Sequence, residues 1–226
     1  MDTIVAIFPH PDDDAYGMGG TLLLMKERFR LHSLCLTKGE RGLSPDPRAQ
    51  TAATRQKEEE ACCRLLGAEL EFLEQIDGEV FAGREICERV AARLKDLRPR
   101  AVLTTFPMEN HPDHAATAEI AVKAVRLAGL YDTVEVYQAE EGAGTQTICF
   151  DPHLYVDITS VFERKKELLR CHACQNLDGR MIEAVTAQNR LRGDMARCNY
   201  AEAWRSYFPL VNWRQGRRPV PVLLEL

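Results

Sequence analysis

The chain has 226 residues, of which 45% are hydrophobic, enough for one sizeable core, so we expect a single domain spanning residues 1–226. The formal net charge of −5 argues against a nucleic-acid surface, and the basic cluster Arg214, Arg217 and Arg218 is more typical of a solvated tail. No stretch approaches the ~18 apolar residues that span a bilayer. The start of the chain lacks the basic segment of a secretory signal, so we expect a cytoplasmic protein with no membrane span.

Residues 3–8 are a continuous apolar run, as expected of a strand buried on both faces of a parallel sheet. The pattern then predicts a helix over 20–29, a strand over 31–36, a long loop over 38–48, a helix over 51–66, a strand over 70–73 and a helix over 86–97. A strand over 101–106, a helix over 115–127, strands over 134–138 and 154–158, and a mostly helical last third with its clearest helix over 161–171 complete the prediction. This alternation predicts an α/β sandwich with a mainly parallel sheet.

Two clusters of histidine and aspartate follow predicted strands. The first lies in the loop 8–20 (FPHPDDDAYGMGG), directly after the first strand, and the second is 110–114 (NHPDH), after the strand 101–106. Sites in parallel sheets form outside the carboxyl ends of the strands. We therefore expect the two clusters to converge on one site.

The two clusters together contain the residue types of a hydrolytic metal centre. A catalytic zinc takes three protein ligands from His and carboxylate, and His10, Asp13 and His114 can supply them. Two histidines and one carboxylate also suit ferrous iron, so Zn²⁺ and Fe²⁺ both remain open. Such a metal lowers the pKa of bound water from 15.7 to about 7. Asp12, beside the ligand Asp13, is the natural general base for that water.

The second cluster offers partners for the reacting carbonyl and the leaving group. We expect His111 to stabilise charge on the carbonyl oxygen or to protonate the leaving amine, with Asp113 holding its tautomer. A simple turn followed by helix caps is the alternative for both clusters. We favour a cap for Asp14, but three adjacent acids beside a buried strand end would repel one another unless a cation offsets them.

Two further motifs carry less weight. Gly17, Gly19 and Gly20 have the spacing GxGG instead of the dinucleotide fingerprint GxGxxG, and more plausibly allow a helix to pack closely on the sheet. Residues 171–174 (CHAC) have CxxC spacing, but no second pair accompanies them. We expect the eight cysteines to be mainly reduced thiols without a redox or zinc role.

The paired motifs PHPDD (9–13) and HPDH (111–114) resemble the LmbE-like, or PIG-L, family of zinc-dependent de-N-acetylases. The resemblance covers nearly the whole chain, through Gly19-Gly20, an RxxE…LG helix with Arg55 and Glu58, Asp77-Gly78, a late VDI…HxxQ segment from Val156 to Gln175, and a YAEA-like ending at Tyr200. One departure is Cys174, where a serine often precedes the glutamine.

The resemblance implies a Rossmann-like three-layer α/β sandwich forming a single LmbE-like deacetylase domain. It also implies that His10, Asp13 and His114 are the zinc ligands and that Asp12 is the general base. His111 would then be the histidine that stabilises the oxyanion or donates a proton, with Asp113 as its partner. Arg55 matches a position near the substrate, and Asp77 matches one that contacts a sugar hydroxyl. The alternatives are an ion pair of Arg55 with Glu58 or Glu59 on its own helix, and a simple Asp-Gly turn at Asp77.

The implied reaction is hydrolysis of an N-acetyl group on a glucosamine-type small glycoconjugate, releasing acetate and a free amine. Length and motifs are similar to those of small bacterial members that process thiol precursors. Alternatives are a metal-dependent hydrolase of another N-acyl, ester or phosphoester substrate, or a non-catalytic sugar- or metal-binding module. Similar proteins often form homo-oligomers, but the chain itself does not reveal an interface.

Overall fold

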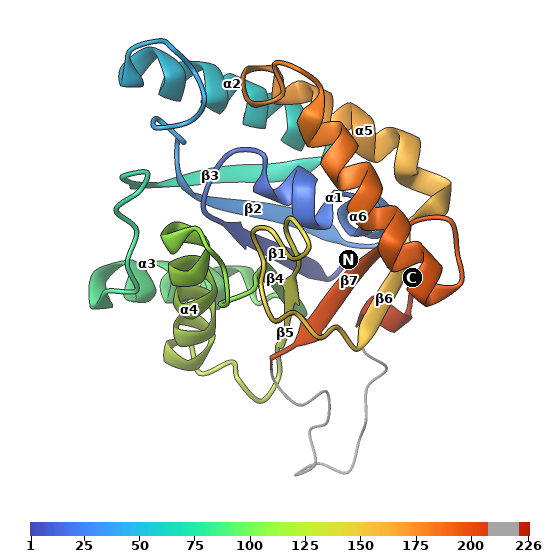
Figure 1. Ribbon diagram of the computed structural model, residues 1–226. Helices are drawn as coiled ribbons and strands as arrows, with labels where there is room; N and C mark the ends of the chain where they lie inside the picture. The colour runs from blue at the N-terminus through green and yellow to red at the C-terminus, as the bar shows by residue number, and fades with distance from the viewer. Residues whose placement is uncertain (208–221) are drawn as a thin grey trace.

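The computed structural model describes residues 1–207 and 222–226, and the basic cluster expected to be a solvated tail lies outside them. Seven strands form one sheet in the order β3-β2-β1-β4-β5-β7-β6 (Figure 1). Their bounds are β1 Thr3–Phe8, β2 Arg30–Thr37, β3 Ala68–Gln75, β4 Ala101–Thr105, β5 Glu135–Ala139, β6 Leu154–Asp157 and β7 Ala201–Ser206. All neighbours pair in parallel except β7, which is antiparallel to both β5 and β6. The predicted mainly parallel sheet is confirmed.

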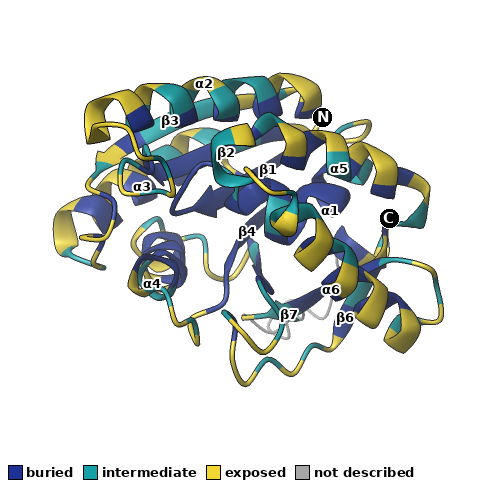
Figure 2. Cartoon of the chain, turned by 45° about the horizontal axis from the view of Figure 1, so that its top comes forward, coloured by how far each residue is buried: buried dark blue, intermediate teal, exposed yellow. Residues whose placement is uncertain are grey.

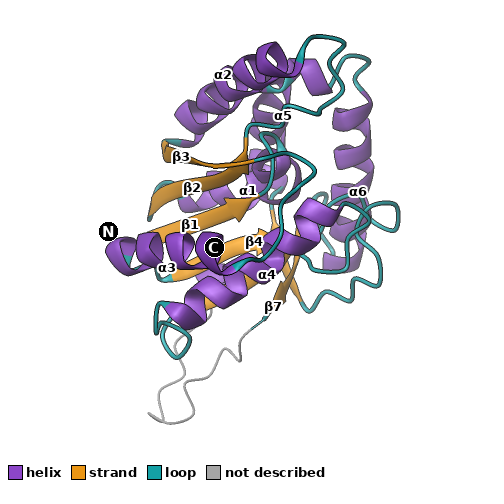
Figure 3. Ribbon diagram, turned by 90° about the vertical axis from the view of Figure 1, so that its left-hand side faces the viewer, coloured by secondary structure: helices purple, strands orange, loops and turns teal. Residues whose placement is uncertain are grey.

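Helices cover both faces of the sheet (Figure 3). One layer holds α1 Gly19–Met25, α2 Arg48–Leu66, α5 Phe162–Cys171 and α6 Arg180–Ala196, and the other holds α3 Arg84–Leu97 and α4 Pro112–Leu127. Short turns complete the fold: the π-helical turn η1 Asp14–Met18 and the 3₁₀ turns η2 Thr159–Val161, η3 Ala173–Gln175 and η4 Val222–Leu224. None of the described helices is both long enough and apolar enough to cross a bilayer.

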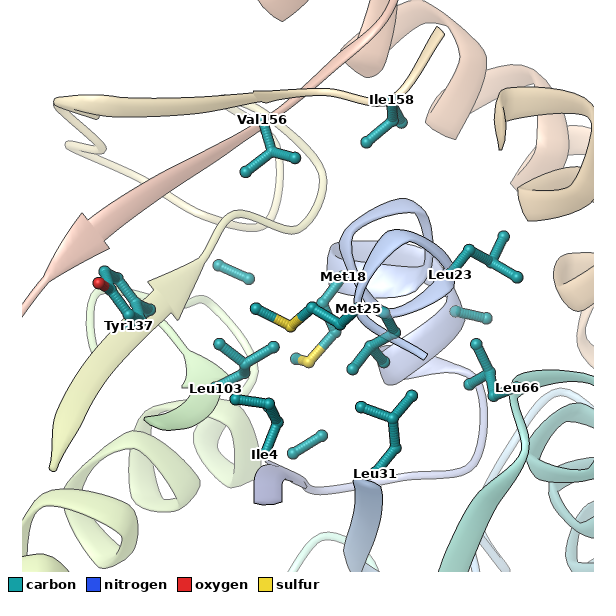
Figure 4. Packing of buried hydrophobic residues seen from close by; sticks show 14 of the residues in the cluster. Ile4, Met18, Leu23, Met25, Leu31, Leu66, Leu103, Tyr137, Val156 and Ile158 are labelled. Atoms are coloured by element: carbon teal, nitrogen blue, oxygen red, sulfur yellow. The ribbon is translucent and has the colours of Figure 1, made fainter. Parts of the chain in front are cut away.

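Strand β1 is buried on both faces because its alternate residues enter two separate cores. Ile4 and Phe8 pack in the core under α1, α2, α5 and α6, whereas Val5 and Ile7 pack in the core under α3 and α4. Figure 2 shows the resulting pattern, in which the central strands and the short helix α1 are buried and the longer helices expose their outer faces. In the first core, Met18 fills the space above Ile4 and its neighbours (Figure 4).

One strand of the sheet differs from the sequence prediction. The sequence pattern predicts a mostly helical last third, yet this part of the chain contributes β7 between β5 and β6. The strand carries Glu202, which is 1% exposed. Its Oε1 forms an ion pair with Nζ of the buried Lys165 at 2.7 Å. A charged residue inside a short run masks the apolar pattern by which strands are identified. Its partner lies on a different element and is not visible in the local sequence.

The close helix packing predicted for the glycines is found at Gly20. A Cβ placed there would lie 2.7 Å from Cγ2 of Ile158, just after β6, whereas at Gly19 it would lie 3.2 Å from the flexible tip of Leu168. We expect Gly20→Ala to lower the free energy of unfolding by roughly 1–3 kcal/mol, because a branched side chain beside the backbone must move. Gly19→Ala is the matched control. Urea unfolding of both variants checks the prediction, and equal free energies of unfolding would contradict it.

Candidate active site

The carboxyl ends of β1, β2, β3, β4 and β5 surround a pocket of about 400 Å³. Every site residue predicted from the sequence except Asp113 lines this pocket. The two histidine clusters therefore converge at the carboxyl ends of parallel strands, where sites in such sheets form, although about a hundred residues separate them along the chain. The rings of His10 and His114 lie 5.3 Å apart, and the ring of His111 is 4.8 Å from His10 and 5.0 Å from His114.

His10 is buried and its two ring nitrogens face carboxylates. Nδ1 lies 3.2 Å from Oδ2 of Asp13, while Nε2 lies 3.0 Å from Oδ2 of Asp113 and 3.2 Å from Oδ1 of Asp77. Burial opposes protonation, but hydrogen bonds with Asp113, Asp13 and Asp77 raise the pKa of His10 well above its ordinary value. A carboxylate on the far nitrogen of a histidine orients the ring and increases its basicity as a metal ligand.

His114 is also buried and faces the same aspartate. Its Nε2 lies 3.5 Å from Oδ1 of Asp13, and its Nδ1 lies 3.2 Å from Nε2 of Gln146 and 3.4 Å from Oε2 of Glu141. Burial lowers the pKa of His114 to about 4, so the imidazole is neutral, as a metal ligand must be. Burial favours the neutral form of Asp13, yet His114 and His10 hold its pKa well below the usual range.

The donor set fits a divalent cation. Facing nitrogens of His10 and His114 lie beside the two oxygens of Asp13, and ligand atoms of Asp13, His114 and Glu141 all lie within 4.8 Å of one another. Glu141 Oε1 and Glu109 Oε2 are buried without a hydrogen-bond partner. Buried carboxylates in this number need an opposite charge. Zinc and iron both accept such nitrogen and oxygen ligands.

Asp12 has an unusual backbone conformation. Its φ is +113°, a value that non-glycine residues rarely adopt and that persists where the surroundings impose it. Oδ1 accepts a hydrogen bond from Nη2 of Arg55 at 3.0 Å, and the Asp12 amide donates to Oε2 of Glu59 at 3.3 Å. Burial raises the pKa of Asp12 to about 7, against the lowering effect of Arg55. A base with a pKa near neutrality can accept a proton under ordinary conditions.

Arg55 and Asp77 both lie in the pocket. Arg55 is 4% exposed, and its guanidinium donates to the carbonyl oxygens of Pro11 and Gly39 as well as to Asp12. Its ion pair is therefore with Asp12 of the loop after β1, and the alternative of a pair with Glu58 or Glu59 is wrong. Asp77 contacts His10 and accepts a hydrogen bond from the Arg41 amide at 2.7 Å, so it does more than form a turn.

The partner predicted for Asp113 is wrong. Its carboxylate bonds to His10 and accepts from the amides of Gly78 at 2.7 Å and Val80 at 3.2 Å. His111 is the N-cap of α4, and its Nδ1 accepts from the Asp113 amide at 3.3 Å. The backbone thus sets the tautomer of His111 and leaves the proton of the neutral ring on Nε2.

The N-cap predicted at Asp14 is wrong, because the N-cap of η1 is Asp13 and no side chain caps this turn. Asp14 is the first residue of η1, and its Oδ1 accepts from the amide of the next residue, Ala15, at 2.6 Å. It is also fully buried, and its Oδ2 has no hydrogen-bond partner. Burial raises its pKa to about 7.

The sequence pattern does not identify several residues of the pocket. Glu141 and Gln146 follow β5, and their side chains reach His114. Glu141 also follows the carboxyl end of a parallel strand, so the reasoning that located the two histidine clusters could have found it as well. The long loop after β2 supplies Arg41, Gly42 and Leu43 to the pocket wall, and Gln175 joins them across the opening, accepting from the Leu43 amide at 3.1 Å.

The contact between Asp113 and His10 leads to a prediction about metal affinity. We expect Asp113→Asn to weaken Zn²⁺ binding by about 10- to 100-fold. The uncharged side-chain amide of asparagine would orient the ring of His10 less firmly than the carboxylate does and would not increase its basicity. Competition with a chromogenic chelator measures the dissociation constant. Asp96→Asn, at an exposed position on α3, is the control. Unchanged affinity in Asp113→Asn would remove this residue from the support of the centre.

Comparisons with known proteins show what this chain is similar to. The family model described as GlcNAc-PI de-N-acetylase (PIG-L) matches residues 5–125. A diacetylchitobiose deacetylase of Thermococcus kodakarensis is 29% identical over 185 residues, covering 76% of this chain and 69% of that protein. A Bacillus cereus protein named "Probable N-acetyl-alpha-D-glucosaminyl L-malate deacetylase 2" is 26% identical over 76% of this chain and 83% of its own. The crystal structure of a 4-carboxy-2-hydroxymuconate hydratase from Pseudomonas putida superposes with a TM-score of 0.84, at 26% identity, over 93% of this chain and 98% of that one.

Proposed function

This chain belongs to the PIG-L family, and we propose that it is a metal-dependent N-deacetylase that removes the acetyl group from a glucosamine-type small glycoconjugate. The products are acetate and a free amine, and residues 1–226 act as a single domain. The observation that carries the proposal is the convergence of His10, Asp13 and His114 around one point, with Asp12 beside them. These are the groups that amide hydrolysis requires.

In this proposal His10, Asp13 and His114 hold a divalent metal, with Zn²⁺ first and Fe²⁺ as the alternative. When bound, the metal supplies a Lewis acid and lowers the pKa of a water molecule from 15.7 to about 7. Asp113 and Asp77 support the ring of His10 from its far nitrogen. Glu141 and Gln146 do the same for His114.

The chain's own residues manage the protons. Asp12 accepts the proton of the attacking water, and Arg55 keeps its carboxylate turned toward the pocket. The oxygen of water bonds to the acetyl carbon, and the bond from that carbon to nitrogen breaks. As a neutral ring, His111 donates a hydrogen bond from Nε2 to the carbonyl oxygen. Asp12 passes the proton it took from water to the departing nitrogen. The nitrogen leaves with the proton it gains, as a free amine.

The charge of the pocket supports a neutral sugar substrate. Four acids line it, namely Asp12, Asp13, Asp77 and Glu141, against the two arginines Arg41 and Arg55. The Arg55 guanidinium is already bonded within the protein, and Arg41 pairs with Glu79. A metal would offset only part of this negative charge. A product that gains a positive amine suits the pocket better than a polycarboxylate does.

A hydratase is the second candidate, because a hydratase structure matches 93% of this chain with a TM-score of 0.84. An assay with two arms separates the candidates. One arm measures acetate released from N-acetylglucosamine conjugates of varied aglycone, together with ester and phosphoester substrates. The other follows the loss of ultraviolet absorbance when water adds to an unsaturated polycarboxylate. We expect turnover in the N-acetyl arm, and turnover confined to the unsaturated acids would replace the proposed function by hydration.

A further inference from the structure

A second group of ligand-type side chains lies inside the helical layer and does not line the pocket. Asp14 belongs to η1, Glu59 and Cys62 to α2, and His172 follows the end of α5. All four are 0% exposed. The segments that carry them are distant in sequence, and the fold brings their polar ends together within the apolar core.

Three of the side chains, Asp14, Cys62 and His172, are close enough to share one ion. One ligand atom each of Asp14, Cys62 and His172 lies within 4.8 Å of the other two. Oε2 of Glu59 lies 3.9 Å from Nε2 of His172. Oε1 of Glu59 accepts from the thiol of Cys63 at 3.2 Å, which leaves Oε2 directed toward the histidine and the Asp12 amide.

Several of these atoms lack a partner. Both ring nitrogens of His172 and Oδ2 of Asp14 are buried without a hydrogen bond. A buried polar atom left unpaired costs about 1–3 kcal/mol, so an imidazole with both nitrogens unpaired calls for an explanation. Within residues 1–207 and 222–226, neither Asp14 nor Glu59 forms an ion pair with a lysine or arginine. The two carboxylates are therefore not paired with a cationic side chain in this part of the chain, and a bound cation would balance them.

We propose that Asp14, Cys62 and His172, with Glu59 as fourth ligand, form a second, buried site for a divalent transition metal. The mixture of nitrogen, sulfur and oxygen donors suits zinc, and four protein ligands leave no open position, as in structural zinc sites. The site joins η1, α2 and the end of α5. Because Glu59 also accepts from the Asp12 amide, the bound ion would help to hold the loop that carries Asp12 and Asp13.

The neighbouring CxxC pair is not part of this site. The thiol of Cys171 points to the carbonyl oxygen of Glu167, and that of Cys174 donates to Glu58 at 2.9 Å. All eight cysteines are free thiols. It is the histidine between the two cysteines, His172, that turns into the core.

Cobalt replacement tests the proposal on the whole protein. A thiolate bound to Co²⁺ gives a ligand-to-metal charge-transfer absorption in the near ultraviolet, and the three ligands proposed for the catalytic centre include no sulfur. Protein produced in cobalt-containing, zinc-poor medium should hold two metal ions per chain and show this absorption. Cys62→Ser should lose the absorption and one ion, whereas Cys87→Ser, a buried cysteine on α3, should keep both. His114→Ala should lose one ion and keep the absorption.

Wild-type protein with no thiolate–cobalt absorption would overturn the proposal, and so would an absorption that persists in folded Cys62→Ser. If Cys62→Ser does not fold by circular dichroism, the wild-type spectrum and metal count still decide. The readouts do not depend on turnover. A protein that hydrolyses no acetamide but shows the absorption would therefore refute the proposed function and leave this site standing.

Discussion

Asp12→Asn should lower kcat for acetate release by about 10²- to 10⁴-fold, the usual contribution of a positioned acid–base group. The amide has nearly the same shape as the carboxylate and can still bond to Arg55 through its oxygen, but it cannot accept a proton from water. The metal content should stay as in the wild type, because the nitrogens and oxygens proposed as ligands belong to other residues. Steady-state kinetics and elemental analysis of the same sample check both parts.

Asp46→Asn is a suitable control for Asp12→Asn, because Asp46 is an exposed acid of the loop 38–48. It should retain wild-type kcat. An Asp12→Asn protein with full activity and bound metal would show that another group takes the proton. Loss of metal in that variant would instead make Asp12 part of the ligand set.

His114→Ala should abolish activity by removing one metal ion per chain. A metal at such a site is worth several kcal/mol of transition-state stabilisation, which corresponds to at least about a thousandfold in rate. Chelator-treated wild type should recover activity when Zn²⁺ is returned, whereas His114→Ala should not recover. His32→Ala is the matched control, since His32 lies near the start of β2, away from the carboxyl end of that strand, and does not line the pocket.

Inductively coupled plasma mass spectrometry measures the metal content of each variant. A His114→Ala protein that keeps the wild-type metal content would remove His114 from the ligands. Normal kcat in chelated wild type would be the more serious result, because it would make the centre unnecessary for the reaction.

The residues at the strand ends were predictable because two simple patterns agree there. The apolar run of β1 and the apolar run of β4 identify buried parallel strands, and the carboxyl ends of such strands meet at one edge. This is why the amino-acid sequence is sufficient to pair His10 with His114. The same reasoning applies to Glu141, which follows β5 and lies beside His114. It was not predicted because the segment after β5 contains no histidine that would indicate a site.

Other features depend on contacts that no local pattern contains. Asp113 follows His111 by two residues, and its side chain turns instead to His10, because His111 caps the helix with its ring against the backbone. Strand β7 is hidden by Glu202, whose charge is balanced by Lys165 on α5. The positive φ of Asp12 is imposed by the loop around it and has no signature in the residue type.

The most direct test of the account is hydrolysis in water enriched in oxygen-18. Metal-loaded protein incubated with an N-acetylglucosamine conjugate should release acetate and free amine in equal amounts, with the heavy oxygen appearing in the acetate and none entering the sugar. This result would place the attack of water at the acetyl carbon. Failure to release acetate from any N-acetylated sugar conjugate, or entry of the heavy oxygen into a carbon–carbon double bond of an unsaturated acid, would contradict the account.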